Sequence, residues 1–235
     1  MIPKIIHYCW LGGEKPQGVL NYIDKWKRLH PDYTVKEWNE TNFDIRKNRF
    51  VHEAYMTGQY AFCADYMRLY ALYSEGGIYL DTDVEILKPF DSLLDQKGFA
   101  GYEYGNYAGT GVIGVEPHQK WIKDLMHDYE YQTFISWTGK LNNVANTVRI
   151  SGKLRQYGFP GDGKFCSLNN GLNIYPIDYF CAHRQNSDEF YITENTFCIH
   201  HFSSTWLNRS SVVVKILKRI RNIYKKLLLM VNPQA

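Results

Sequence analysis

The sequence predicts an α/β fold, and three patterns near its amino terminus support this prediction. Residues 2–10 are rich in β-branched and aromatic residues and end before a Gly-Gly pair, which is typical of a strand followed by a turn. Apolar residues recur with helical spacing over 19–30. Residues 33–38 then alternate as a second strand does. A strand, a helix and a parallel strand in this order make up one unit of an α/β sheet.

The rest of the chain continues as a mixture of helices and strands. Residues 41–58 are polar and predict a helix or a pair of loops. Residues 105–114 hold four glycines, which would let a ligand approach the backbone closely. Further helices are expected over 61–74, 118–131 and 142–157, and further strands over 99–104, 112–115, 172–176 and 197–200.

A D-x-D stretch, Asp81-Thr82-Asp83, is the centre of the prediction. It follows a glycine pair that would let the chain reverse direction after the preceding helix. We expect one strand over 78–86, which places Asp81, Asp83 and Glu85 on the same face. Three carboxylates on one face repel each other, and a divalent cation such as Mg²⁺ or Mn²⁺ would relieve that repulsion. A solvated acidic strand edge is the alternative.

Other residues add candidates for the same site. Asp65 and Arg68 share a helix face and would point into the cleft beside the D-x-D stretch, with a plain intrahelical ion pair as the alternative. His200 and His201 follow a strand, and a neutral imidazole can complete a metal shell begun by carboxylates. Hydrogen-bonded core histidines are the alternative. Trp10, after the first strand, is either a core residue or a flat face on which a base stacks.

Composition and charge narrow the class of protein. Of the 235 residues, 45% are apolar and 16% aromatic, which favours a globular domain with a sizeable core. Residues 1–206 hold all 24 acidic residues and 20 of the 27 Lys and Arg, which argues against nucleic acid as a partner of this part. Five cysteines without a C-x-x-C pair favour reduced thiols in a cytoplasmic protein. We expect no signal peptide and no membrane-spanning segment.

The carboxy-terminal segment differs in charge from the rest. Seven Lys and Arg and no acidic residue follow residue 206. Residues 212–231 predict an amphipathic helix with an apolar stripe opposite a basic face. We therefore expect a domain over 1–208 and a tail over 209–235 whose basic helix lies on an anionic membrane surface. Packing of this helix on the domain is the alternative.

Three motifs resemble those of glycosyltransferase family 32, which includes yeast initiating mannosyltransferases and is distantly related to the glucosylating domains of large clostridial toxins. They are IPKIIHYCWLGG at 2–13, ADYMR at 64–68 together with GGIYLDTD at 76–83, and HHFSSTW at 200–206. Their order along the chain matches that of the family. The resemblance implies a GT-A fold, which is a nucleotide-binding mixed sheet flanked by helices. It also implies a metal-dependent, retaining transfer of a sugar from a nucleotide-sugar.

The resemblance implies roles for residues that bind the donor. By motif position, Trp10 stacks on the base, and Asp65 and Arg68 hold the donor sugar. Ser204 is a further contact near the metal, and Trp206 reaches the leaving phosphate. The catalytic set implied in this way is Asp65, Arg68, Asp83 and Trp206.

The resemblance also implies a site for Mn²⁺ or Mg²⁺. Asp83 is the direct ligand, and Asp81 contacts both the ribose and the metal. His201 completes the set, and it is chosen over His200 because it lies three residues before Ser204.

Donor and acceptor stay open at the level of the sequence. UDP-galactose, UDP-glucose, UDP-N-acetylhexosamine and GDP-mannose are all compatible, with UDP favoured. The resemblance points to a saccharide acceptor in surface or capsular polysaccharide synthesis, possibly on a lipid carrier at the inner face of the plasma membrane. Two other functions compete: a haloacid-dehalogenase-type phosphatase that uses the D-x-D stretch, and a non-catalytic sugar-binding protein.

Overall fold

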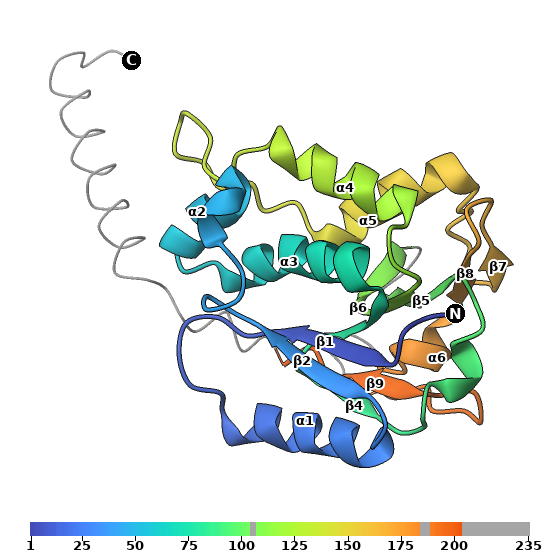
Figure 1. Ribbon diagram of the computed structural model, residues 1–235. Helices are drawn as coiled ribbons and strands as arrows, with labels where there is room; N and C mark the ends of the chain where they lie inside the picture. Colours follow the sequence, from blue (N-terminus) through green and yellow to red (C-terminus); the bar gives the residue numbers. More distant parts are fainter. Residues whose placement is uncertain (104–106, 184–188, 204–235) are drawn as a thin grey trace, which may run out of the picture.

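The computed structural model describes residues 1–103, 107–183 and 189–203, which form a mixed sheet with helices on both faces (Figure 1). The expected helix over 212–231, the domain boundary at 208, Ser204 and Trp206 lie outside the described residues. Within the described ranges, no helix has the length and apolar character needed to cross a membrane.

The elements alternate along the chain as an α/β fold requires. The strands are β1 (Ile5–Cys9), β2 (Thr34–Trp38), β3 (Gly77–Leu80), β4 (Val84–Ile86), β5 (Gly98–Glu103), β6 (Tyr107–Val115), β7 (Cys166–Ser167), β8 (Leu172–Tyr175) and β9 (Cys198–His200). The helices are α1 (Gln17–Leu29), α2 (Arg49–Met56), α3 (Tyr60–Glu75), α4 (Lys120–Glu130), α5 (Asn146–Leu154) and α6 (Ile177–Phe180), with 3₁₀ turns η1 (Ile45–Lys47), η2 (Asp91–Leu93) and η3 (Arg155–Tyr157).

The main sheet has the strand order β2-β1-β3-β6-β5-β8-β7. β1 is parallel to β2 and to β3, whereas β6 is antiparallel to both β3 and β5. β4 and β9 form a separate antiparallel pair. Helix α1 makes the crossover between the parallel strands β1 and β2, as such strands require. The predicted α/β class is thus confirmed.

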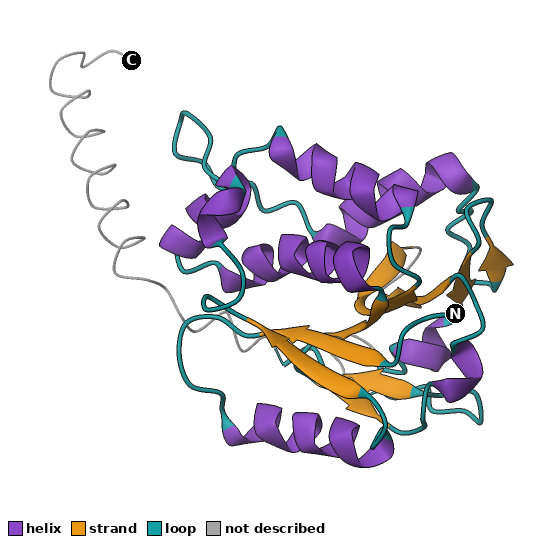
Figure 2. Ribbon diagram, viewed as in Figure 1, coloured by secondary structure: helices purple, strands orange, loops and turns teal. Residues whose placement is uncertain are grey.

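Helices cover the main sheet on both faces. In Figure 2, α3, α4 and α5 lie above the sheet and α1 lies below it, next to the β4-β9 pair. Trp26 of α1 is fully buried, and its indole Nε1 donates to the carbonyl of Val84 at 2.9 Å. This contact fixes α1 against β4, so the second sheet layer is held by a helix of its own.

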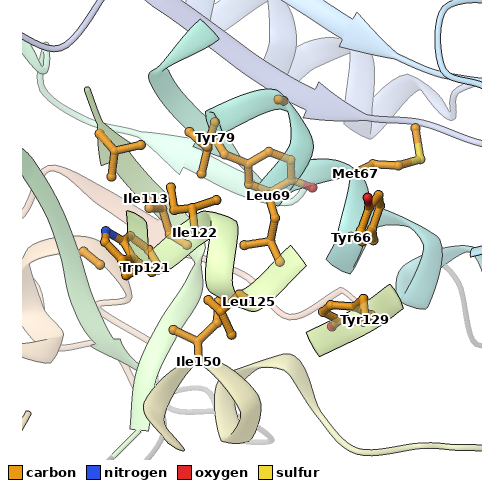
Figure 3. Close-up of a cluster of buried hydrophobic side chains, with 14 of the residues drawn as sticks. Tyr66, Met67, Leu69, Tyr79, Ile113, Trp121, Ile122, Leu125, Tyr129 and Ile150 are labelled. Carbon is orange, nitrogen blue, oxygen red and sulfur yellow. The ribbon is translucent and has the colours of Figure 1, made fainter. Parts of the chain in front are cut away.

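The core between the sheet and α3–α5 is built from large side chains (Figure 3). Leu69 of α3, Tyr79 of β3 and Ile122 of α4 are each at most 1% exposed and belong to one buried cluster. Burying such side chains contributes roughly 1.5–3 kcal/mol each. Because α3 lies at the centre of this core, the residues on its first turns are held rigidly relative to the sheet.

One element prediction is wrong, and the error bears on the site. The single strand expected over 78–86 is two strands, β3 and β4, which belong to different sheets. Between them Asp81-Thr82-Asp83 forms a turn, in which the Val84 amide donates to the Asp81 carbonyl at 3.0 Å. Asp side chains favour turns because they bond to nearby backbone. The carboxylates therefore do not share a strand face but lie where the chain passes between sheets.

Gly76 and Gly77 form the turn from α3 into β3 as predicted, and the glycines of the second glycine-rich segment lie within a strand. Gly76 and Gly77 have φ of 65° and 91°, and a Cβ on Gly77 would lie 2.6 Å from the Ile5 carbonyl oxygen. Only glycine lets β3 lie this close to β1. The glycines within 107–114 lie in β6, where their missing side chains admit neighbours from other elements.

Candidate functional site

Several of the predicted site residues lie at or beside the carboxyl ends of two parallel strands. Trp10 follows β1 directly, and Asp81 follows β3, the parallel neighbour of β1. In open α/β sheets, ligands bind in the crevice beyond these strand ends. The helix α3 adds Asp65 and Arg68 to the same place, as the contacts below show.

Arg68 links the helix to the D-x-D turn. Its Nη2 lies 3.1 Å from Asp65 Oδ1 and 3.3 Å from Asp81 Oδ1. Its Nη1 donates to the Thr110 carbonyl of β6 at 2.5 Å, and its guanidinium lies over the Tyr79 ring. A side chain that is only 5% exposed thus joins three elements, and the expected convergence of Asp65 and Arg68 on Asp81 is seen.

Burial and charge act against each other in this pair. Burial raises the pKa of Asp65 to about 6, although the Arg68 charge works in the opposite direction. For Arg68, burial lowers the pKa, but the charge of Asp81 and other neighbours raises it above its ordinary value. Arg68 is therefore a permanent cation that two carboxylates share.

Asp83 is held more tightly than Asp81. Its Oδ2 accepts hydrogen bonds from the Ser203 amide at 2.8 Å and from the Ser203 hydroxyl at 3.1 Å. Its Oδ1 lies 3.1 Å from Nε2 of His200. Burial acts to raise the pKa of Asp83, but the His200 and Ser203 hydrogen bonds lower it to about 2. Asp83 is thus an ionised carboxylate with a fixed orientation.

His200 lies between the acidic groups of the site. Its Nε2 is 3.1 Å from Asp83 Oδ1 and 3.9 Å from Asp81 Oδ2, and its Nδ1 is 3.9 Å from Glu103 Oε2. Burial acts to lower the pKa of His200, but Asp83, Cys181 and Glu103 raise it well above its ordinary value. A protonated imidazole at this position supplies positive charge beside the D-x-D carboxylates.

The structure places His201 differently from the expectation. Its Nε2 lies 2.9 Å from Glu85 Oε2, and its ring stacks on Tyr22 of α1. Only its backbone reaches the turn, where its amide donates to the Asp83 carbonyl at 3.1 Å. His200 is the last residue of β9 and its ring faces the D-x-D turn, whereas the ring of His201, which follows the strand, faces α1. The expectation from spacing named His201, but the imidazole of His201 lies beside Glu85 and not beside the D-x-D carboxylates.

Several residues of the site were not expected from the sequence. Gly111 of β6 accepts the Asp81 amide through its carbonyl at 2.9 Å, and a Cβ there would lie 2.8 Å from His200 Nδ1. Glu103 of β5 accepts the Thr110 amide at 3.2 Å. Ser203 binds Asp83 as described. The four glycines of 105–114 were a signal for close approach, but nothing in the sequence pairs Glu103 or Ser203 with the turn.

Trp10 follows β1, the parallel neighbour of the strand that leads into the D-x-D turn. It is partly buried against the apolar cluster that contains α1, and its Nε1 donates to the Gly13 carbonyl at 2.7 Å. This bond ties the indole to the Gly12-Gly13 turn. The arrangement fits a stacking face whose polar atom is satisfied by the protein itself.

The acidic groups are suited to share a cation with a ligand. Asp81 and Asp83 both face the same nitrogen of His200, so their oxygens converge on one place. No group of three or more His, Cys, Asp and Glu side chains among the described residues is arranged to hold a metal ion by itself. Mg²⁺ and Mn²⁺ sites commonly use one or two carboxylates and take their other ligands from phosphate and water.

A comparison with known families identifies this arrangement. Residues 16–100 match the family described as "Glycosyltransferase sugar-binding region containing DXD motif". Residues 16–100 are thus similar to this DXD-motif glycosyltransferase region. The match includes Asp65, Arg68 and the D-x-D turn, and the predicted resemblance is thus confirmed.

Curated relatives of the DXD-motif region extend the match. The chain is 35% identical over 155 residues to inositol phosphoceramide mannosyltransferase 3 of Schizosaccharomyces pombe, which covers 60% of this chain and 43% of the relative. It is 22% identical over 209 residues to a human alpha-1,4-N-acetylglucosaminyltransferase, which covers 85% and 57%. The chain thus spans about half the length of the curated relatives it matches.

A solved structure bears on the fold. The PaToxG glycosyltransferase matches with a TM-score of 0.50 at 21% identity, over 68% of this chain and 70% of that chain. This likeness concerns the fold alone. Together with the mixed sheet and its two helical layers, it confirms the predicted GT-A fold.

Proposed function

We propose that this DXD-motif protein is a glycosyltransferase that takes its sugar from a nucleotide-sugar, and that the crevice around the Asp81-Thr82-Asp83 turn binds this donor. The observation that carries the proposal is the convergence of Asp65, Arg68, Asp81 and Asp83 from α3 and the turn. Their sequence positions fall in the matched family region. A solvated acidic edge would not hold a buried guanidinium between two carboxylates.

The two ends of the proposed donor meet different groups. Asp65, buried beside Arg68, accepts hydrogen bonds from hydroxyls of the sugar. Trp10 stacks on the base. Asp81 lies between Arg68 and His200 and binds the ribose and the metal. By motif position, Ser204 and Trp206 add contacts at the diphosphate.

Mn²⁺ or Mg²⁺ fits the carboxylates of the turn as a cofactor. Asp81 and Asp83 would hold it, and we assign the neighbouring imidazole to His200 in place of His201 because only His200 faces both carboxylates. When bound, such a cation neutralises charge on a leaving diphosphate. Ser203 keeps Asp83 oriented through two hydrogen bonds, so little reorganisation is needed.

The transfer is proposed to retain the configuration of the sugar through a same-face mechanism, in which the acceptor hydroxyl attacks from the side of the leaving diphosphate. A double displacement would need a free carboxylate nucleophile. Glu103, a further carboxylate beside His200, is partly buried and accepts a hydrogen bond from the Thr110 amide. A covalent glycosyl-enzyme detected by intact mass spectrometry would contradict the same-face mechanism.

The proposal also names the donor, the acceptor and the location of the protein. The donor is a UDP-hexose or UDP-N-acetylhexosamine, with GDP-mannose as the alternative, since one relative is named as a mannosyltransferase and another as an N-acetylglucosaminyltransferase. The acceptor is a saccharide of a surface or capsular polysaccharide, on a lipid carrier. The basic segment 212–231 would hold the protein on the inner face of the plasma membrane.

The experiment is nucleotide-sugar hydrolysis in the presence of Mn²⁺, measured as release of nucleoside diphosphate from each of the four donors. We expect slow release from one donor, and we expect Asp83→Asn to reduce it by about a hundredfold or more, because the amide cannot supply the anionic ligand. The matched control is Asp32→Asn, which changes an exposed carboxylate near Lys4. Release of inorganic phosphate from simple phosphate esters would instead support the phosphatase alternative, and full activity in Asp83→Asn would refute the site.

A further inference from the structure

A short hairpin between α4 and α5 carries the most exposed large apolar side chain of the described chain. Ile135 and Leu141 pair across it, and Trp137 at its tip is 97% exposed. We refer to residues 135–141 as the Trp137 hairpin. In Figure 1, this loop projects beside α2, away from the main sheet.

The exposure of Trp137 is imposed by an ordered turn. The Ser136 amide donates to the Lys140 carbonyl at 2.9 Å, and the Gly139 amide donates to the Ser136 carbonyl at 2.8 Å. The Ser136 hydroxyl lies 2.9 Å from the Thr138 hydroxyl and accepts the Lys140 amide at 3.0 Å. These bonds give the tip an ordered backbone, on which the Trp137 side chain is presented to solvent.

The base of the hairpin is anchored to the helical layer. Phe134 is fully buried, and its ring packs against Phe50 of α2 and Phe62 of α3 at centroid distances of 5.3 and 5.0 Å. The Ile135 amide donates to Glu53 of α2 at 2.9 Å. The hairpin is thus a rigid projection of the α2–α3 layer.

Other exposed apolar side chains lie around this projection. Met56, at the end of the anchoring helix α2, is 52% exposed, Tyr131 before the hairpin is 77% exposed, and Val144 after it is 45% exposed. Aromatic residues with a polar edge and aliphatic side chains together are the composition of a surface that enters the lipid headgroup region. Met and Val offer no stacking face for a sugar ring.

The charge of this region suits an anionic partner. No Asp or Glu occurs from residue 131 to residue 161, and Lys140 lies in the hairpin itself. Each Lys or Arg near an anionic bilayer contributes about 1 kcal/mol.

We propose that the Trp137 hairpin docks on an anionic lipid membrane, with the Trp137 indole in the headgroup region and Lys140 beside lipid phosphates. This surface is formed by residues that have no role in the proposed donor site, so the proposal goes beyond the function proposed above. It gives the domain its own contact with a membrane.

The test is co-sedimentation of the full chain with vesicles of phosphatidylcholine mixed with phosphatidylglycerol, compared with pure phosphatidylcholine. In the bound state, the Trp137 indole would be buried in the lipid headgroup region. We therefore expect Trp137→Ala to lower the partition coefficient on the mixed vesicles about tenfold. The matched control is Phe165→Ala, which removes an exposed aromatic ring next to β7 at the other edge of the sheet and should change nothing. Lys140→Glu should weaken binding most at low salt.

The basic segment 212–231 is also expected to bind anionic vesicles, so a second readout reports on Trp137 itself. Lipids brominated near the headgroups should quench part of the tryptophan fluorescence in the wild type, and less of it in Trp137→Ala. Equal partitioning and equal quenching of the two proteins would overturn the proposal. It would also be overturned if Trp137→Ala bound vesicles normally but lost transfer to a soluble saccharide, or if it only abolished self-association.

Discussion

The imidazole of His200 and the second carboxylate of the D-x-D turn are direct neighbours, with His200 Nε2 3.1 Å from Asp83 Oδ1. This contact joins β9, near the end of the described chain, to the turn between β3 and β4. It places the imidazole of His200 beside the turn, whereas the next imidazole, His201, lies beside Glu85.

Exchanging these histidines one at a time should separate their roles. We expect His200→Ala to reduce Mn²⁺-dependent nucleotide-sugar hydrolysis by about ten- to a hundredfold, since groups that hold or orient a metal site have effects of this size. His201→Ala should leave the Mn²⁺ concentration for half-maximal activity nearly unchanged. The measurement is a Mn²⁺ titration of each variant, and the opposite ranking would return the role to His201.

Gly111 should be sensitive to a single added methyl group. A Cβ there would lie 2.8 Å from His200 Nδ1 and 3.3 Å from Asp81 Oδ2, so Gly111→Ala must displace one of them. We expect donor hydrolysis to fall by about a hundredfold with little change in melting temperature. The control is Gly18→Ala in α1, where a Cβ meets nothing within 4 Å and should stabilise the helix slightly. A normal rate in Gly111→Ala would show that this close approach is not needed.

Arg68 should matter for folding as well as for activity. Arg68→Ala leaves Asp65 and Asp81 without their shared cation, and we expect the free energy of unfolding in urea to fall by about 3 kcal/mol. Adding Asp65→Asn should recover part of this loss, because one buried charge is then removed. The exposed pair of Lys120 and Asp124 serves as the control, since Lys120→Ala should change stability by less than about 1 kcal/mol. Equal losses of stability in Arg68→Ala and Lys120→Ala would contradict a buried, shared cation at Arg68.

His7 should make stability depend on pH. Its Nδ1 accepts from Trp38 Nε1 at 3.1 Å and its Nε2 donates to the Gly76 carbonyl at 2.8 Å, so the ring is neutral. Burial lowers its pKa from 6.5 to about 4. Between these values the unfolded chain binds a proton that the folded chain does not, so stability is full above pH 6.5 and falls as the pH drops.

The size of this effect is about 3 kcal/mol by pH 4. It can be measured as the change in urea midpoint between pH 7 and pH 4.5 in the wild type and in His7→Gln. The variant should lose this part of the pH dependence. An identical slope in both proteins would mean that His7 is not buried in its neutral form.

Much of the fold follows from the sequence because local patterns decide it. The helices α1, α3 and α4 lie within two residues or so of their predicted bounds, since apolar periodicity marks all three and Gly76 ends α3. The prediction of one strand over 78–86 is wrong. Val84 and Ile86 alternate as a strand does, but no local signal shows that they pair with β9 instead of continuing β3. Pairing partners are long-range information that periodicity does not contain.

The candidate site was predictable only where its parts are close in the chain. Asp65 and Arg68 are one helical turn apart, and a glycine pair brings them to Asp81, so this convergence could be inferred. Glu103 and Gly111 come from β5 and β6, and their place depends on the strand order of the sheet. The choice of His200 depends on which face of β9 meets the turn, and strand alternation alone leaves both faces open.

The most direct test of the donor site is the position of the cation and nucleotide in crystals grown with Mn²⁺ and a nucleoside diphosphate, located by the anomalous scattering of manganese. The proposed function predicts one peak bridging the diphosphate to the Asp81 and Asp83 carboxylates, with His200 next to it and the base on Trp10. A peak away from this turn, or a nucleotide bound elsewhere on the protein, would contradict it.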